Sequence, residues 1–280
     1  MATRQNITVS PDFPGARLII EQITACGKPA EATVIYEGAR NTLFYVDAPQ
    51  LAIHSPNPHR NAFAINVKAF RVPPFPNDYI YATFRAGKAA RSYEFARRLT
   101  DMGFNTPAPL GYSETNSGLR IAGNIGIWPR LTRSYYFCEQ LQFPDMRCWE
   151  GRPDRDALIE ALGAEIGRLH AAGIWMKDFS TGNILVQPPK DSSDGHYRFH
   201  YVDLNRTAFG VKERSRLMQM FKALSCSREI TLDIAAAYAR ATGRDMAQVQ
   251  AEAGKAFDTF HKRMQRKQRL KALFRSRNRS

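Results

Sequence analysis

The chain has 280 residues with 44% hydrophobic and 11% aromatic content, which fits one large domain or two lobes and excludes a disordered chain. Its four cysteines are scattered without a C-x-x-C pair, which argues against a disulfide framework or a zinc knuckle, and no apolar run reaches the length of a signal-peptide core or a membrane span. The net charge of +14 predicts an anionic partner, whether nucleic acid, anionic lipid or a phosphorylated substrate.

The first part of the chain is predicted to be mainly β-structure. Residues 1–30 give an ambiguous pattern with one short buried element. From residue 33 onward, two apolar runs flank Gly38 and Asn41, which is typical of a β-hairpin. Residues 63–70 then predict a third strand, with Lys68 near its end.

A helix is predicted from residue 81 to residue 102, because its apolar residues form a stripe and Gly103 with two following prolines ends it. Glu94 lies in the middle of this helix. Asp78 is a competing acid, but it follows Pro76 and Asn77 and is expected in a turn.

The sequence then predicts strands at 110–114, 119–127 and 134–141, with a turn at 116–118 between the first two. A proline-containing connector marks a boundary, so we expect a nucleotide-binding lobe at 1–141 and a mainly helical lobe at 142–280.

The second lobe is predicted to open with a helix that Asp154 caps and that ends near Gly173. His170 at the end of this helix is expected to be a buried packing residue. Beyond residue 203 the chain is predicted to be wholly helical, and it ends in a basic tail at about 261–280.

The stretch 169–206 contains three polar residues, Asp178, Asn183 and Asp203, each next to an apolar strand pattern. Protein kinases carry H-R-D-x-x-x-x-N followed by D-F-G, and this chain has M-K-D-F-S-T-G-N followed by D-L-N. Phosphoryl transfer needs a carboxylate that orients a hydroxyl and an Asn/Asp pair that holds Mg²⁺. The alternative is a hairpin in which these polar residues only shape turns. The apolar runs that follow Asn183 and precede Asp203 favour the phosphotransferase interpretation.

In that interpretation, Asp178 accepts the proton of the acceptor hydroxyl, and Asn183 and Asp203 coordinate Mg²⁺ through oxygen. Lys177 either neutralises the γ-phosphate or serves as a structural cation. Leu204 and Asn205 replace the Phe and Gly of D-F-G, so a flipping activation switch is less expected.

The other predicted contacts are with ATP. Lys68 would reach the α- and β-phosphates and Glu94 would hold its ammonium by an ion pair, unless these are a surface lysine and a solvated helix acid. The gap between the two is longer than protein kinases usually leave. The chain lacks G-x-G-x-x-G, and Gly38 is either a phosphate contact or only a turn residue.

With these residues in hand, the chain resembles the lipopolysaccharide core kinase (Kdo/WaaP) family over roughly residues 30–210. The most telling segment is K-A-A-R-S-Y-E-F-A-R-R-L-T-D-M-G-F-N-T-P-A-P-L-G-Y at 88–112, together with N-V-K-A-F, L-H-A-A-G-I, K-D-F-S-T-G-N-I-L-V and Y-V-D-L-N-R. One departure is Met176, which stands where such enzymes commonly have His.

The resemblance implies an α+β, two-lobe protein-kinase-like fold, with an antiparallel β lobe that carries helix αC and a mainly helical second lobe. It also implies ATP and Mg²⁺ as cofactors, and transfer of phosphate to a heptose or Kdo hydroxyl of the lipopolysaccharide inner core. The rival interpretations are a kinase of the same fold with an aminoglycoside, choline-like or protein acceptor, and a non-catalytic pseudokinase or basic scaffold.

We expect a cytoplasmic protein that contacts the anionic inner face of the cytoplasmic membrane through its tail. Residues 261–280 hold nine Lys and Arg and no acid, and Met264, Leu270, Leu273 and Phe274 share part of one helical face. The alternative is a solvated, frayed terminus. Because no nucleic-acid motif is recognised, nucleic acid is not expected as the partner.

Overall fold

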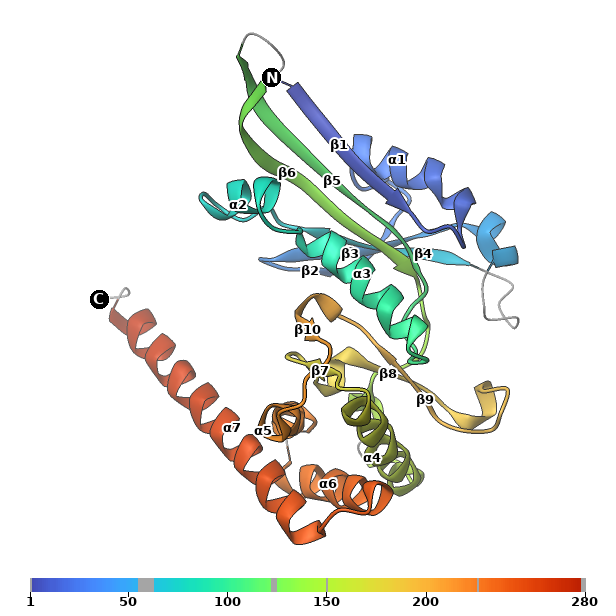
Figure 1. Cartoon of the computed structure of the whole chain (residues 1–280), viewed down its shortest axis with the longest axis vertical. Helices are drawn as coiled ribbons and strands as arrows, with labels where there is room; N and C mark the ends of the chain where they lie inside the picture. The colour runs from blue at the N-terminus through green and yellow to red at the C-terminus, as the bar shows by residue number, and fades with distance from the viewer. Residues whose placement is uncertain (1, 55–62, 122–124, 150, 226, 278–280) are drawn as a thin grey trace. The chain divides into compact units, whose positions relative to one another are not determined.

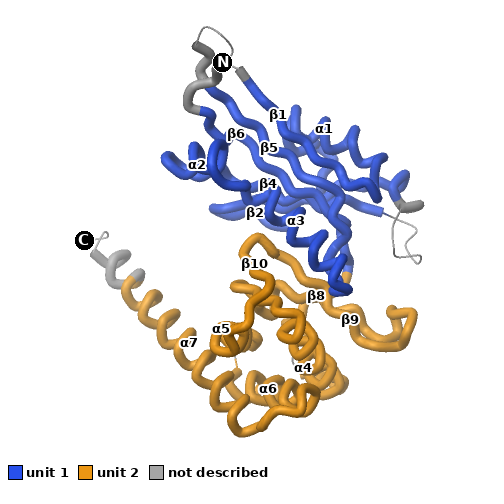
Figure 2. Tube along the Cα trace, in the orientation of Figure 1, with its two compact units in different colours: residues 1–142 blue, residues 143–280 orange. Residues whose placement is uncertain are grey.

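The computed structural model describes residues 2–54, 63–121, 125–149, 151–225 and 227–277 (Figure 1). The chain divides into two compact units, residues 1–142 and 143–280 (Figure 2). The sequence-based boundary lay between residues 141 and 142.

The first unit is built on a six-stranded antiparallel sheet in the order β1-β5-β6-β4-β3-β2. The strands are β1 (Ala2–Val9), β2 (Thr33–Glu37), β3 (Asn41–Asp47), β4 (Ala64–Phe70), β5 (Pro109–Ile121) and β6 (Ile125–Glu139). The predicted hairpin β2–β3 and the strand that carries Lys68 are confirmed.

Helices cover both faces of this sheet. Alternate residues of each strand point to opposite sides, so each face supplies its own side chains to a helix. On one face, Ile20 and Ile23 of α1 (Arg17–Cys26) share a buried core with apolar residues such as Val67 and Phe137. On the other face, Tyr93 of α3 (Lys88–Asp101) packs its ring 5.6 Å from that of Tyr112 on β5.

The single helix predicted at 81–102 is wrong, since two helices occupy this region, α2 (Asn77–Thr83) and α3. Gly87 precedes α3, and a Cβ built on it would lie 1.8 Å from a carboxylate oxygen of the buried Glu114. A larger residue at this position, directly before α3, would therefore displace the Glu114 side chain.

The predicted turn position of Asp78 is also wrong. Asp78 lies in α2, its side chain is 2% exposed, and it forms an ion pair with Arg130 of β6. This residue anchors α2 to the sheet, because a buried carboxylate needs a cation partner.

Two further strand predictions fail in the first unit. β5 continues through residues 116–118, where a turn was expected, and residues 122–124 lie outside the described part of the chain. β1 was not predicted, and it pairs with β5 at one edge of the sheet, with Ile7 opposite Ser113.

The second unit is mainly helical, with α4 (Arg155–Ala171), α5 (Arg214–Leu217), α6 (Arg228–Thr242) and α7 (Met246–Arg277). Two short antiparallel pairs accompany the helices: β7 (Trp175–Met176) with β10 (Thr207–Ala208), and β8 (Ile184–Gln187) with β9 (Arg198–Tyr201). The strand β10 and the short 3₁₀ turns correct the expectation of wholly helical structure after residue 203.

Two predictions about α4 have opposite outcomes. Asp154 stands at the N-terminal cap position but makes no capping hydrogen bond, because its carboxylate bonds Arg152 at 3.1 Å and Tyr197 at 3.3 Å instead. His170 is confirmed as a buried residue: it is 8% exposed and its Nδ1 lies 3.2 Å from the Tyr238 hydroxyl.

The described part of the chain holds no helix with both the length and the apolar character that crossing a bilayer requires.

Candidate active site

The segment before Asp178 is positioned by a glycine turn and a two-residue strand. Gly173 follows α4 with a φ of 66°, and a Cβ there would lie 3.2 Å from the backbone of Val211. Glycine therefore suits both the left-handed conformation and the limited space. The chain then enters β7, in which Met176 pairs with Thr207 of β10.

The antiparallel pairing of β7 with β10 brings two acids together, since β7 leads into Asp178 and Asp203 shortly precedes β10. Asp178, Asn183 and Asp203 line one small cavity within the second unit, together with Lys177 and Arg206. The structure thus places the four sequence-predicted residues of this lobe in one site.

Asn183 ties the Asp178 loop to the strand that precedes Asp203. Its side-chain amide nitrogen donates to the backbone carbonyl of Asp178 at 2.8 Å. The backbone carbonyl of Asn183 accepts from the backbone amide of Val202 at 3.0 Å. Because the amide nitrogen is used within the loop, the amide oxygen is the atom available to a cation.

Asp203 has left-handed backbone angles, with φ 58° and ψ 50°, and it is the one residue other than glycine with positive φ in the described chain. Such a conformation costs about 1–2 kcal/mol for an L-residue and is found often at functional sites. The side-chain amide of Asn205 donates to Asp203 Oδ1 at 2.7 Å, which fixes the carboxylate.

Arg206 is a site residue that the sequence pattern did not predict. Its guanidinium donates from two nitrogens to the two carboxylate oxygens of Asp178, each at 2.5 Å. A bidentate pair of this kind fixes the plane of the carboxylate. The signal in the sequence was its place at the end of D-L-N-R, but nothing there indicated its partner.

Lys222 is a second cation that was missed. Its ammonium donates to the carbonyl oxygen of Lys177 at 2.7 Å. Burial lowers the pKa of Lys222, and nearby Lys177 and Arg206 lower it further, while attraction to Asp178 opposes the shift. Lys222 lies on a 3₁₀ turn far along the chain, where no local pattern marks it.

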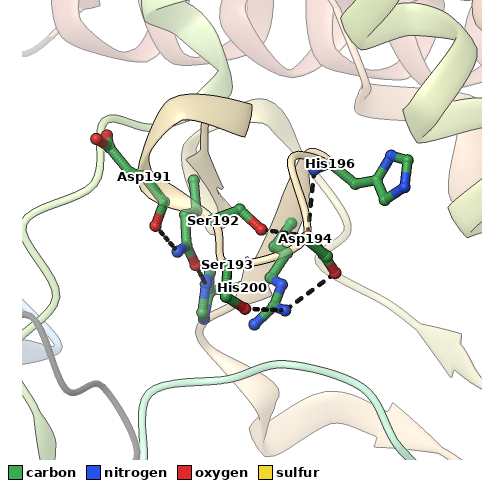
Figure 3. Close-up of polar contacts among 8 residues, drawn as sticks. Asp191, Ser192, Ser193, Asp194, His196 and His200 are labelled. Atoms are coloured by element: carbon green, nitrogen blue, oxygen red, sulfur yellow. Dashed lines mark hydrogen bonds and ion pairs between the residues drawn. The ribbon is translucent and has the colours of Figure 1, made fainter.

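Polar contacts hold the turn between β8 and β9 (Figure 3), the strand pair that Asn183 precedes and Asp203 follows. Asp194 accepts hydrogen bonds from Ser192, from the amide of His196 at 3.2 Å and from Arg198 at 3.0 Å. These bonds hold the pKa of Asp194 well below its usual range, and the bond from Ser192 is the largest cause. The turn residues have a structural role, whereas Asn183 and Asp203 face the cavity.

Lys68 lies on β4 opposite Tyr136 of β6, which in turn lies opposite Tyr112 of β5. Cross-strand partners share a face, so Lys68 projects from the face covered by α3. Its ammonium is 5.4 Å from the centre of the Phe70 ring. This placement meets a requirement of the predicted phosphate contact, which itself stays a prediction.

Glu94 lies on α3, as the predicted role requires, but its side chain is exposed while Tyr93 and Leu99 are buried. Among the described ion pairs of the first unit, none joins Glu94 to Lys68. Their pairing therefore stays a prediction. The buried acid next to α3 is Glu114, whose pKa is raised by burial and lowered in part by a hydrogen bond from the Ala90 amide.

Gly38 lies in the hairpin loop between β2 and β3, and its amide donates to the carbonyl of Asn41 at 3.0 Å. A Cβ at this position would lie 2.3 Å from the hydroxyl of Tyr36. A larger residue would therefore displace the exposed Tyr36 side chain, and phosphate contact by Gly38 stays a prediction.

The chain matches the model of a known family. The model of the family described as "Lipopolysaccharide kinase (Kdo/WaaP) family" matches residues 75–253, which is more than half of the chain and includes the cavity residues of the second unit. No curated protein matches the sequence.

Among solved structures, the chain is similar to "WaaP in complex with acyl carrier protein", with 17% identity and a TM-score of 0.55 over 93% of this chain and 98% of that one. It also matches the Rio2 kinase from Chaetomium thermophilum, with 14% identity and a TM-score of 0.47 over 91% and 79% of the two chains. The likeness to WaaP shows that the fold is protein-kinase-like.

Proposed function

The chain belongs to the lipopolysaccharide kinase (Kdo/WaaP) family, and we propose that it transfers the γ-phosphate of ATP to a heptose or Kdo hydroxyl of the lipopolysaccharide inner core. The observation that carries this proposal is the convergence of Asp178, Asn183 and Asp203 on one cavity within the matched residues. Protein kinases use this set of side chains for phosphoryl transfer to an alcohol.

In the proposed reaction, Asp178 accepts a hydrogen bond from the sugar hydroxyl and takes its proton as the bond to phosphorus forms. Its side chain is 25% exposed, so an acceptor can reach it from solvent. Arg206 fixes the plane of the carboxylate in the absence of substrate. Lys177 is exposed beside Asp178, where its ammonium would balance the charge of the transferred phosphate.

The residues present fit a Mg²⁺ ion, because Asn183 and Asp203 offer the amide and carboxylate oxygens that hard cations prefer. When bound, the ion would neutralise charge on the ATP phosphates. Lys68, with Glu94 as its proposed partner, and the loop around Gly38 would bind the nucleotide from the first unit.

We also propose that α7 holds the enzyme at the anionic face of the membrane. The start of α7 packs through buried Val249, Ala253 and Phe257, but residues 262–270 are exposed throughout. Met264 and Leu270 are the exposed apolar side chains of this part, and those of Leu273 and Phe274 lie outside what the structure describes. A basic helix with exposed apolar residues suits an anionic bilayer surface, where each basic residue contributes about 1 kcal/mol.

The test of the reaction is mass spectrometry of core oligosaccharide incubated with ATP and the purified protein. Wild type should add the mass of phosphate, whereas Asp203→Ala and Asp178→Asn should not, and Asp178→Asn should still bind ATP. Asp156→Asn is the matched control, because Asp156 is an exposed acid of the same unit. Full turnover by a folded Asp203→Ala variant would refute the assignment of this site.

The test of the helix is cosedimentation with vesicles, with and without anionic lipid and at two salt concentrations. The intact chain should bind anionic vesicles in low salt, and a chain that ends at Phe260 should bind them less. Equal binding by the two chains would exclude residues 261–280 from membrane contact.

A further inference from the structure

A second concave site lies in the helical unit, and the proposed reaction does not use it. A cavity of about 870 Å³ is bounded by the C-terminal half of α4, residues 210–217 and the end of α6. It shares no lining residue with the cavity that contains Asp178. Glycine and alanine supply a large part of its wall, and Gly167, Ala171 and Ala241 are among the residues that leave the space open.

The charged side chains that line this cavity are all cations: Arg168, Lys212, Arg214 and Arg244. Two acids outside the lining pair with two of them, since Glu165 lies 2.6 Å from Arg168 and Glu252 lies 2.9 Å from Arg214. Two positive charges therefore remain uncompensated by these ion pairs. Nη2 of Arg214 is buried and has no hydrogen-bond partner within the described chain.

Backbone amides already serve part of the capping role that these cations could have. The C-terminal ends of α4 and α6 both meet the cavity, and cations near a helix C-terminus often serve its free carbonyls. Here each helix ends in a glycine with positive φ, Gly173 and Gly243. The amide of Gly173 donates to the carbonyl of His170, and the amide of Arg244 donates to that of Ala239. Backbone amides thus bond part of the terminal carbonyls.

The buried wall of the cavity is consistent with a positive potential. His170 and Tyr238 line it, and the imidazole is 8% exposed. The pKa of His170 is lowered to about 4, first by burial and then by the positive charge of Arg244, with Arg214 adding to the effect. The histidine is therefore neutral at pH 7, and the cations are left to interact with a ligand.

We propose that this cavity binds a phosphomonoester dianion, with the phosphate held by Lys212, Arg214 and Arg244 and the body of the molecule against the small-residue wall. The two positive charges that the ion pairs with Glu165 and Glu252 leave uncompensated match a dianion, and guanidinium groups bind phosphate oxygens through paired N–H donors. The volume exceeds the need of a phosphate ion alone, so it accommodates a phosphorylated small molecule or a phosphorylated lipid headgroup. The site is independent of the proposed kinase reaction.

The test compares the full-length chain with two double variants. The cavity variant is Lys212→Gln with Arg244→Gln. The control is Lys190→Gln with Arg4→Gln, which removes the same charges from exposed positions outside the cavity and outside the basic tail. Circular dichroism should show that both variants fold as the wild type does.

One arm measures calorimetric binding of glycerol 3-phosphate at constant ionic strength, and the other measures cosedimentation with vesicles that contain phosphatidic acid. In at least one arm the cavity variant should bind about tenfold more weakly than the wild type, while the control binds normally. Loss in the first arm identifies a soluble ligand, and loss in the second identifies a lipid headgroup. Equal behaviour of the cavity variant and the control in both arms would overturn the proposal.

Discussion

The contact between α4 and α6 depends on Gly163, so Gly163→Ala should destabilise the helical unit. A Cβ built on Gly163 would lie 2.5 Å from the Cβ of Ala237 and 2.5 Å from the backbone nitrogen of Tyr238. Both obstacles are fixed to the backbone of α6 and cannot rotate away. Overpacking of this kind costs about 1–3 kcal/mol, against which alanine gains about 1 kcal/mol of helix propensity. We expect a net loss of up to about 2 kcal/mol in the free energy of unfolding.

Gly254→Ala is the matched control, because Gly254 is also helical but its built Cβ meets the end of the flexible Arg228 side chain at 2.8 Å. That side chain can move, so the control should be neutral or up to about 1 kcal/mol more stable. Urea unfolding followed by circular dichroism measures both. If Gly163→Ala proves as stable as Gly254→Ala, the two helices do not approach as closely as the structure indicates, or α6 yields at little cost.

Three further predictions concern the pair Lys68 and Glu94, the residue Arg206 and the residue His170. If Lys68 and Glu94 act as a unit, each alanine substitution should weaken turnover and the double variant should be little worse than either; multiplicative losses would exclude the pair. Arg206→Ala should lower turnover about ten- to a hundredfold without changing ATP binding, because Asp178 loses its orientation. Arg206→Lys should restore only part of the turnover. Unchanged turnover in Arg206→Ala would contradict this role. Because the pKa of His170 is lowered to about 4 from its usual 6.5, the unfolded chain binds a proton that the native chain excludes as pH falls from 6.5 to 4. Stability should therefore drop by about 3 kcal/mol over that window, and a folded His170→Asn variant should lack this part of the pH dependence in urea unfolding.

The local part of the site could be predicted from the sequence, because its residues stand just before or just after short apolar strands. Asn183 directly precedes β8 and Asp203 follows β9, and the antiparallel pairing of these strands places both at the same end. A strand pattern of four residues with polar residues at its ends is enough to predict this arrangement.

The contacts around Asp178 could not be predicted, because they depend on pairs far apart in the chain. β7 and β10 are two residues long, so neither has a periodicity that a sequence reveals. Arg206 reaches Asp178 only because these strands pair, and Lys222 reaches the loop from a separate 3₁₀ turn. The crowding at Gly87, directly before α3, has the same origin, since it comes from the carboxylate of Glu114 on β5.

The D-L-N sequence differs from D-F-G in a way that bears on regulation. In protein kinases this segment adopts active and inactive arrangements, and its glycine gives the backbone freedom to change between them. Here Asn205 holds Asp203 by a 2.7 Å hydrogen bond while Asp203 keeps its left-handed conformation. Releasing Asp203 would require loss of that bond, and an asparagine has fewer backbone conformations available than glycine. The carboxylate is thus held in place by its own loop before any cation binds, and activity should not require a rearrangement of this segment.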